Sequence, residues 1–192
     1  YSTGNAWLGI AAAFFVGTLL GLVHAFICVT LKGNQVVSGL AMTMFGTGAS
    51  SLLGRNFVGF TIPGLNKIPV PLLSDIPVIG PVLFNHDALI YCSYALVFFL
   101  CWFFNSTRQG LYLRATGDNP RAADAMGISV AKTRYFYTMV GAGIVAVGGA
   151  YMSVAYTKMW AEHMTAGRGW IAVALVIFAI WDIFYYVWLK VL

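Results

Sequence analysis

The polar side chains of this chain are few, so the chemistry that their types and spacing allow can be examined one pattern at a time. A phosphate-binding loop of the GxxxxGK[ST] type requires a Gly-Lys pair, and the sequence contains none. The HExxH pattern of zinc hydrolases and the GxSxG pattern of serine hydrolases are absent too. The 6 acidic residues are scattered rather than paired for acid–base work. We therefore expect no catalytic residue.

Cys28, Cys92 and Cys101 all lie in apolar stretches and form no CxxC pair. Free cysteine in such surroundings behaves as a small apolar side chain. We expect no disulfide, no metal and no bound cofactor. The net charge of +5 comes from basic residues dispersed between the apolar stretches. Because they do not cluster beside stacking aromatics, nucleic acid is not an expected partner.

The composition indicates a membrane protein. Of the 192 residues, 60% are hydrophobic and only 9% are charged, against about 25% charged in soluble domains. Several apolar stretches approach or exceed the roughly 18 residues that a membrane-spanning helix needs. We expect an all-α, polytopic helical membrane protein forming a single membrane domain over residues 1–192. The expected spans are residues 6–31, 36–53, 88–104, 135–156 and 169–189.

The basic residues predict how these spans are oriented. Residues 105–134 contain five of them, and cytoplasmic loops carry the excess of lysine and arginine. Alternation of five spans then places seven basic residues inside and four outside, which is self-consistent. Residues 54–87 hold five of the six prolines, so we expect a non-helical or short-helical extracytoplasmic cap there.

Polar and small residues near the start of the second span are candidates for lining a solute path. They are Asn34, Gln35, Ser38, Gly39 and Thr43. Irregular backbone at membrane depth is tolerated where it borders a cavity, so an interrupted second span would line such a path. Close helix packing through small residues explains the same composition. Both interpretations stay open.

A short peptide in the cytoplasmic segment, "GDNPRAADAMGI", has the signals for both ends of a helix. Asn119 suits the N-cap, Pro120 the first helical position, and Gly127 the left-handed residue beyond the end. The enclosed helix over 120–126 is about 10 Å long, too short to cross a bilayer. Ala122, Ala123 and Met126 would form its apolar face. It is either a docking knob or an amphipathic turn that merely joins two spans.

The longer peptide "LRATGDNPRAADAMGISVAKTR" resembles the cytoplasmic coupling-helix loop of bacterial ABC importer permeases of the branched-chain amino acid, simple sugar and nucleoside group. "VTLKGNQVVSGLAMTMFGTGASSLLG" and "GRGWIAVALVIFAIW" resemble that family's second motif and its late span motif, in the same order. "VPLLSDIPVIGPVLF" is most similar to the nucleoside and simple-sugar branch. The resemblance covers about residues 1–181, and "DIFYYVWLKVL" departs from it. We expect the chain to be a fragment of a longer permease.

The resemblance implies a permease subunit, not an enzyme, of an ATP-driven importer that moves a nucleoside or simple sugar across the bacterial plasma membrane. It implies three kinds of protein partner, namely ATPase subunits that use the ATP, a second permease subunit and an extracytoplasmic substrate-binding protein. The lipid bilayer surrounds the assembly. The residues implied to enter a cleft of the ATPase are Gly117, Asn119, Pro120, Ala122, Ala123, Gly127 and Ile128.

An ion-coupled secondary transporter or channel is the alternative. It would need paired ionisable side chains at mid-membrane depth, and the expected spans offer His24 and Asp182. For His24 we favour a neutral histidine hydrogen-bonded inside the bundle. Glu162 and His163 belong to an expected outer loop, either solvated or meeting a binding protein.

Overall fold

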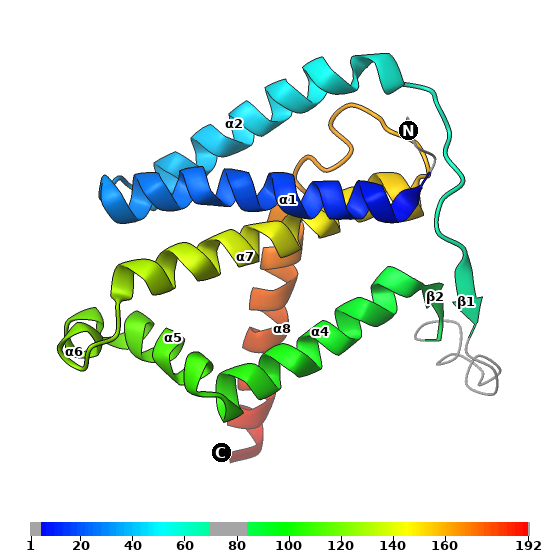
Figure 1. The fold of residues 1–192 in the computed structure, drawn as a ribbon. Helices are drawn as coiled ribbons and strands as arrows, with labels where there is room; N and C mark the ends of the chain where they lie inside the picture. Colours follow the sequence, from blue (N-terminus) through cyan, green and yellow to red (C-terminus); the bar gives the residue numbers. More distant parts are fainter. Residues whose placement is uncertain (1–4, 70–83, 192) are drawn as a thin grey trace.

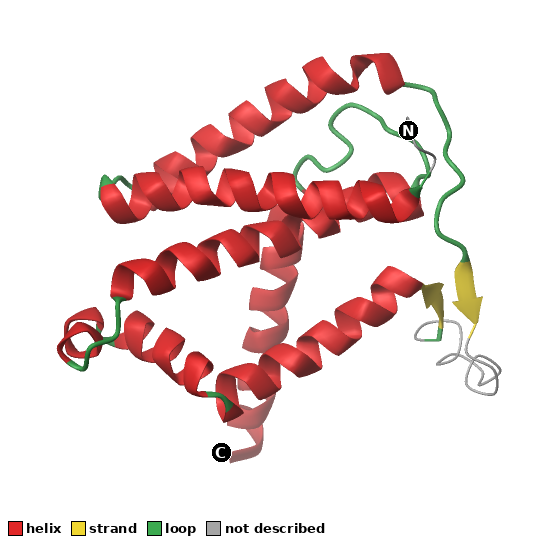
Figure 2. Ribbon diagram, in the orientation of Figure 1, coloured by secondary structure: helices red, strands yellow, loops and turns green. Residues whose placement is uncertain are grey.

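The structure, a computed structural model, describes residues 5–69 and 84–191, with the side chains of 67, 69 and 183–191 left aside. It is built almost wholly from helices (Figures 1 and 2). The helices and strands are α1 (Ala6–Ala25), the π-helix η1 (Phe26–Thr30), α2 (Gln35–Gly54), the 3₁₀ turn η2 (Arg55–Phe57), β1 (Lys67–Pro69), β2 (Asn85–Asp87), α4 (Ala88–Ser106), α5 (Arg108–Asp118), α6 (Pro120–Ala125), α7 (Val130–Tyr151), the π-helix η3 (Met152–Tyr156) and α8 (Arg168–Val191). The expected all-α architecture is confirmed.

Four helical stretches within the described residues are long and apolar enough to cross a membrane. They are Ala6–Thr30, Gln35–Phe57, Ala88–Ser106 and Val130–Tyr156. They coincide with the first four expected spans. The fifth expected span falls within α8, whose 24 residues make a rod of about 36 Å. That α8 also crosses the membrane stays a prediction.

The core of the bundle is the contact between α1 and α7, which lie side by side (Figure 1). Gly17 and Gly21 are one helical turn apart on α1, in a GxxxG pattern, and both are buried. A Cβ atom on Gly17 would lie 2.3 Å from the Cβ of Ala146, and one on Gly21 would lie 2.6 Å from the Cβ of Ala142. The backbones therefore approach as closely as only glycine permits, which maximises dispersion contacts where lipid removes the hydrophobic driving force.

The connections between spans gather at two ends of the bundle. One end holds the α1–α2 connection together with α5 and α6, and the opposite end holds the N-terminus, the β1–β2 pair and the segment 157–167 (Figure 1). The first four expected spans thus alternate in direction, and which end faces the cytoplasm stays a prediction. β1 and β2 pair antiparallel, with Lys67 opposite Asp87, and join the two ends of the proline-rich segment. Its central part, residues 70–83, lies outside the described residues.

Two details differ from the sequence-based expectations. The second span is not interrupted, because α2 is continuous from Gln35 to Gly54. Residues 105–134 are not a loop with one short helix, because the 11-residue α5 precedes α6 and α7 begins at Val130. α5 starts where Thr107 accepts a hydrogen bond from the Gly110 amide at 3.0 Å. Gly110 permits the tight turn, since a Cβ there would lie 2.2 Å from the carbonyl oxygen of Phe103.

We predict that Gly17→Ala destabilises the protein whereas Gly9→Ala does not. The new methyl group at position 17 must displace the α7 backbone, with the carbonyl oxygen of Ala142 only 2.8 Å away, whereas a Cβ at Gly9 meets a single atom at 3.9 Å. Overpacking of this kind costs about 1–3 kcal/mol, which lowers the melting temperature by roughly 2–12 °C. Thermal unfolding of the detergent-solubilised protein measures both. Equal melting temperatures would contradict the close α1–α7 contact.

Candidate coupling knob and solute path

α6 is a short helix closed at both ends, as the sequence predicts. The Asn119 side chain accepts a hydrogen bond from the Ala122 amide at 3.1 Å, and Pro120 occupies the first turn. Gly127 has φ +82°. The Gly127 amide donates to the carbonyl of Asp124 at 2.9 Å and the Ile128 amide donates to that of Ala123 at 3.0 Å. This pair of bonds is a Schellman motif, which satisfies carbonyls left free by the end of the helix.

The three residues expected to form one apolar face of α6 do not share the same surroundings. Ala123 is buried, with 3% of its surface exposed, whereas Met126 is 82% exposed and Ala122 is also exposed. The helix ends one residue earlier than expected, at Ala125, so Met126 is the C-cap. Ala123 therefore fastens the knob to its own chain. Met126, at the tip, leaves most of its apolar side chain exposed.

α5 supplies the base on which this knob stands, and sequence reasoning missed it. Thr116 is almost fully buried, at 2% exposed, and its hydroxyl donates to the carbonyl of Tyr112 at 2.7 Å. α5 contacts both α6 and the start of α7. The signals for it were Thr107 and Gly110, a cap and a turn residue three positions apart. A knob held between two helices is stiffer than a free loop of the same length.

The remaining expected coupling residues, Gly117 and Ile128, differ in whether contacts within the chain explain them. Gly117 lies within α5 in an exposed position, and a Cβ there would meet nothing within 4 Å. Ile128 is half-buried behind the knob. Packing within the described residues therefore explains Ile128, but it does not explain the small size of Gly117.

The expected path residues do not act as one group. Asn34 caps α2, accepting from the Val36 amide at 2.9 Å, and Gln35 is the exposed first residue of that helix. Ser38 is buried against α1, with its hydroxyl 3.0 Å from Nδ1 of His24. His24 is thus a hydrogen-bonded residue of the bundle. These contacts give Asn34, Ser38 and His24 structural roles at the inner end of α2.

Gly39 and Thr43 lie on a different side of α2. The Thr43 hydroxyl donates to the Gly39 carbonyl at 2.9 Å, and Thr47 repeats the pattern on Thr43 at 2.7 Å. With Ser50 one turn further on, these residues form a polar stripe along the helix by the 3.6-residue period. Thr43, Thr47 and Ser50 are exposed. Because the Thr43 and Thr47 hydroxyls are bonded along their own helix, this part of the stripe can border either water or another helix without leaving those two donors unpaired.

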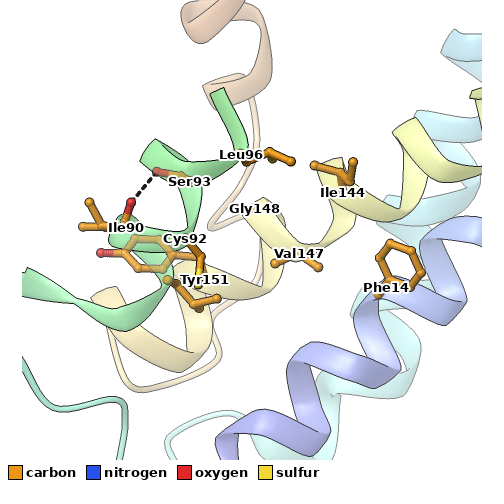
Figure 3. Close-up of a pocket in the computed structure, with 10 residues that line it drawn as sticks. Phe14, Ile90, Cys92, Ser93, Leu96, Ile144, Val147, Gly148 and Tyr151 are labelled. Atoms are coloured by element: carbon orange, nitrogen blue, oxygen red, sulfur yellow. Dashed lines mark hydrogen bonds between the residues drawn. The ribbon is translucent and has the colours of Figure 1, made fainter. Parts of the chain in front are cut away.

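A cavity of about 500 Å³ lies between α4 and α7 and has a mainly apolar lining. Figure 3 shows Leu96 of α4 and Ile144 of α7 pointing toward one another across it, with Phe14 entering from α1. A polar solute here would lose its hydration without gaining hydrogen bonds. This recess therefore suits lipid chains or apolar side chains rather than a polar solute.

These features define a class of protein: a multi-pass helical membrane protein that carries a rigid helical knob between its third and fourth membrane-length helices. Comparison with known proteins gives the family. The chain belongs to the family described as the permease component of the branched-chain amino acid transport system, whose family model matches residues 1–187.

Several curated proteins are similar to this chain. A putative glucose ABC transporter permease protein of Haloferax volcanii is 39% identical over 183 residues, covering 93% of this chain and 56% of that protein. A guanosine ABC transporter permease protein of Bacillus subtilis is 32% identical over 183 residues, covering 91% and 57% respectively. A nucleoside ABC transporter permease protein of Lactococcus lactis is 33% identical over 187 residues, covering 95% and 59%. The chain thus spans a little over half the length of these relatives. No solved structure matches it significantly.

We predict that Asn119→Ala loosens the knob while Asn119→Asp leaves it intact. Alanine removes the oxygen that accepts from the Ala122 amide, whereas aspartate keeps one at the same place. Loss of such a cap costs about 0.5–2 kcal/mol, so the amides of residues 122–126 should exchange with deuterium about 2- to 30-fold faster. Hydrogen-exchange mass spectrometry measures this. Unchanged exchange in the alanine variant would show that the cap does not hold the helix.

Proposed function

We propose that this chain is the central part of a permease subunit of an ATP-binding-cassette importer for a simple sugar or a nucleoside. The family match over almost the whole chain supports a transport permease. The similar proteins named for glucose, guanosine and nucleosides support this solute range. The observation that carries the proposal is the knob, a stiff element at one membrane surface with an exposed apolar tip.

The knob receives force from a partner ATPase. Met126 presents most of its surface to the outside of the chain, and a flexible thioether adapts well to a cleft. Both ends of α6 are closed by hydrogen bonds and its back is fixed through Ala123, so displacement of the tip moves the whole element. Because α7 begins only two residues after Ile128, the displacement passes directly into a membrane-spanning helix.

The helices differ in how firmly they are attached to one another. α1 packs against α7 along its length, whereas α2 contacts α1 near its inner end (Figure 1). A pair of tightly packed helices moves as one body, and a helix that shares few contacts with that body can shift against it. We infer that α2 is the element that changes position most when the importer alternates between outward-open and inward-open states.

The proposed assembly lies in the bacterial plasma membrane and contains two ATPase subunits, a second permease subunit and an extracytoplasmic substrate-binding protein. The knob faces the ATPases in the cytoplasm. The described part of the 54–87 segment and the segment 157–167, at the opposite end of the bundle, face the binding protein (Figure 1). ATP is hydrolysed by the partner, and the present chain converts that event into helix movement.

We predict that Met126→Glu abolishes coupling without unfolding the permease. The side chain is 82% exposed, so the substitution disturbs few contacts within the chain, but it places a charge at the apolar tip. Burial of that charge in a cleft costs several kcal/mol unless it finds a partner. In vesicles containing the complete importer, solute-stimulated ATP hydrolysis and uptake should both fall at least tenfold.

Gln109→Glu is the matched control, because it adds the same charge at an exposed position of α5 away from the tip. Uptake by the control should stay within about twofold, since exposed surface charges contribute little. Full coupling in the Met126 variant would remove the knob from the mechanism. Uptake driven by an ion gradient in the absence of ATP would instead support a secondary transporter.

The proposed orientation predicts which residues a membrane-impermeant reagent reaches from outside. Lys158 and Arg121 are both exposed and lie at opposite ends of the bundle. Lys158→Cys should react in intact cells, and Arg121→Cys should react only after the membrane is opened. The reverse pattern would place the knob outside the cell and exclude contact with a cytoplasmic ATPase.

A further inference from the structure

A second cavity, of about 240 Å³, lies where the outer ends of α2 and α7 meet the segment 157–167. Unlike the larger apolar recess, it is lined mainly by polar atoms. The side chains that give it this character are Ser50 of α2, Ser153 of η3, and Trp160, His163 and Thr165 of the connecting segment. The cavity thus brings together two spans that otherwise share few contacts.

The segment that forms the cavity wall is held in place by backbone hydrogen bonds and by the packing of Trp160. The Trp160 indole lies directly on Gly54, where a Cβ would be 2.2 Å from Cζ2 of the ring. Trp160 also pairs with Val58 in a backbone bridge, and the Ile62 amide donates to the Lys158 carbonyl at 2.9 Å. The segment is therefore fastened to the outer end of α2 and holds its shape over the cavity.

Two residues of the segment 157–167 have a left-handed backbone. Lys158 has φ +54° and His163 has φ +58°, in the region that residues other than glycine adopt uncommonly, although histidine adopts it more often than most. Of the two, His163 lines the cavity. A left-handed backbone at a residue other than glycine costs on the order of 1–3 kcal/mol, and such residues cluster at ligand-binding sites.

The lining groups identify the kind of molecule that fits. Serine and threonine hydroxyls, an imidazole and an indole N–H donate and accept hydrogen bonds without a fixed charge. The Ser153 hydroxyl donates to the Ala150 carbonyl at 3.0 Å, so its lone pairs remain to accept from a ligand. Among the residues that the structure describes, no Lys, Arg, Asp or Glu lines this cavity. The charged ends of an amino acid would therefore lack partners there, which costs several kcal/mol.

The size of the cavity narrows the choice further. Pockets for drug-sized ligands occupy about 300–1,000 Å³, so 240 Å³ holds a single ring with its substituents. We propose that this cavity is the outer binding site for the hydroxyl-bearing ring of the transported solute, either a monosaccharide or the ribose of a nucleoside. The proposal rests on the proposed function, and it assigns the recognition of the solute by the permease to hydroxyl groups rather than to charge.

Solute protection of an introduced thiol tests the proposal. Ser50→Cys places a thiol on the cavity wall, and Ser51→Cys is the matched control, because the neighbouring residue of α2 does not line the cavity. Both are made in the complete importer after removal of its other cysteines, and right-side-out vesicles are treated with a membrane-impermeant thiol reagent. Glucose or guanosine, at about ten times the concentration that half-saturates uptake, should slow reaction at position 50 about tenfold and leave position 51 unchanged.

Leucine is the chemical control, because it is of similar size but carries two charges and no hydroxyl. Protection by leucine and not by glucose or guanosine would overturn the proposal, as would equal protection at positions 50 and 51. Failure of the reagent to reach position 50 at all would also overturn it. ATP-driven uptake is measured in the same vesicles. Uptake without protection contradicts the cavity assignment alone, whereas absence of uptake by the unaltered importer contradicts the proposed function.

Discussion

The close backbone contact between α1 and α7 is the constraint on which the rest of the structure depends. Gly17 and Gly21 permit it, and larger side chains at either position would collide with α7. Near the inner end, the Thr30 and Tyr135 hydroxyls are hydrogen-bonded to each other and join the same two elements. With α1 and α7 joined in this way, they form one rigid body that follows the knob at one end and leads into Ser153, on one wall of the polar cavity, at the other.

Two features near the ends of this rigid body carry the proposed function, and both use satisfied hydrogen bonds to hold a short segment still. At the inner end, the cap at Asn119 and the left-handed turn at Gly127 fix α6. At the outer end, Trp160 on Gly54 and the strained turn at His163 fix the wall of the polar cavity. In each case backbone contacts hold the segment in place. The side chains proposed to face a partner or a solute are therefore not needed for that purpose.

Much of this arrangement could be predicted from the sequence, and the features that were missed have physical reasons. The spans and the knob could be predicted because hydropathy and helix caps are local signals, as the sequence near Asn119 and Gly127 demonstrates. α5 was missed because its composition is polar and its stability comes from Thr116 buried against neighbouring elements. The sequence showed that the start of α2 is rich in polar and small residues. That Ser38 and Thr43 lie on different faces of the helix became clear only from their contacts in the structure. The cavity was not predicted, because it joins residues 50 and 153, which are far apart in sequence.

In the proposed importer, the geometry of α2 links movement at its start to the cavity at its far end. Its contact with α1 includes the Ser38–His24 hydrogen bond, near the start of α2. From Ser38 to Ser50 is 12 residues, or about 18 Å of helix, so a tilt of about 10° would move Ser50 by about 3 Å. That is the length of a hydrogen bond. Because Trp160 is packed on Gly54, the segment 157–167 would follow α2, whereas Ser153 continues from α7. Under the proposal, such a tilt separates Ser153 from the wall that moves with α2, which favours release of a bound ring.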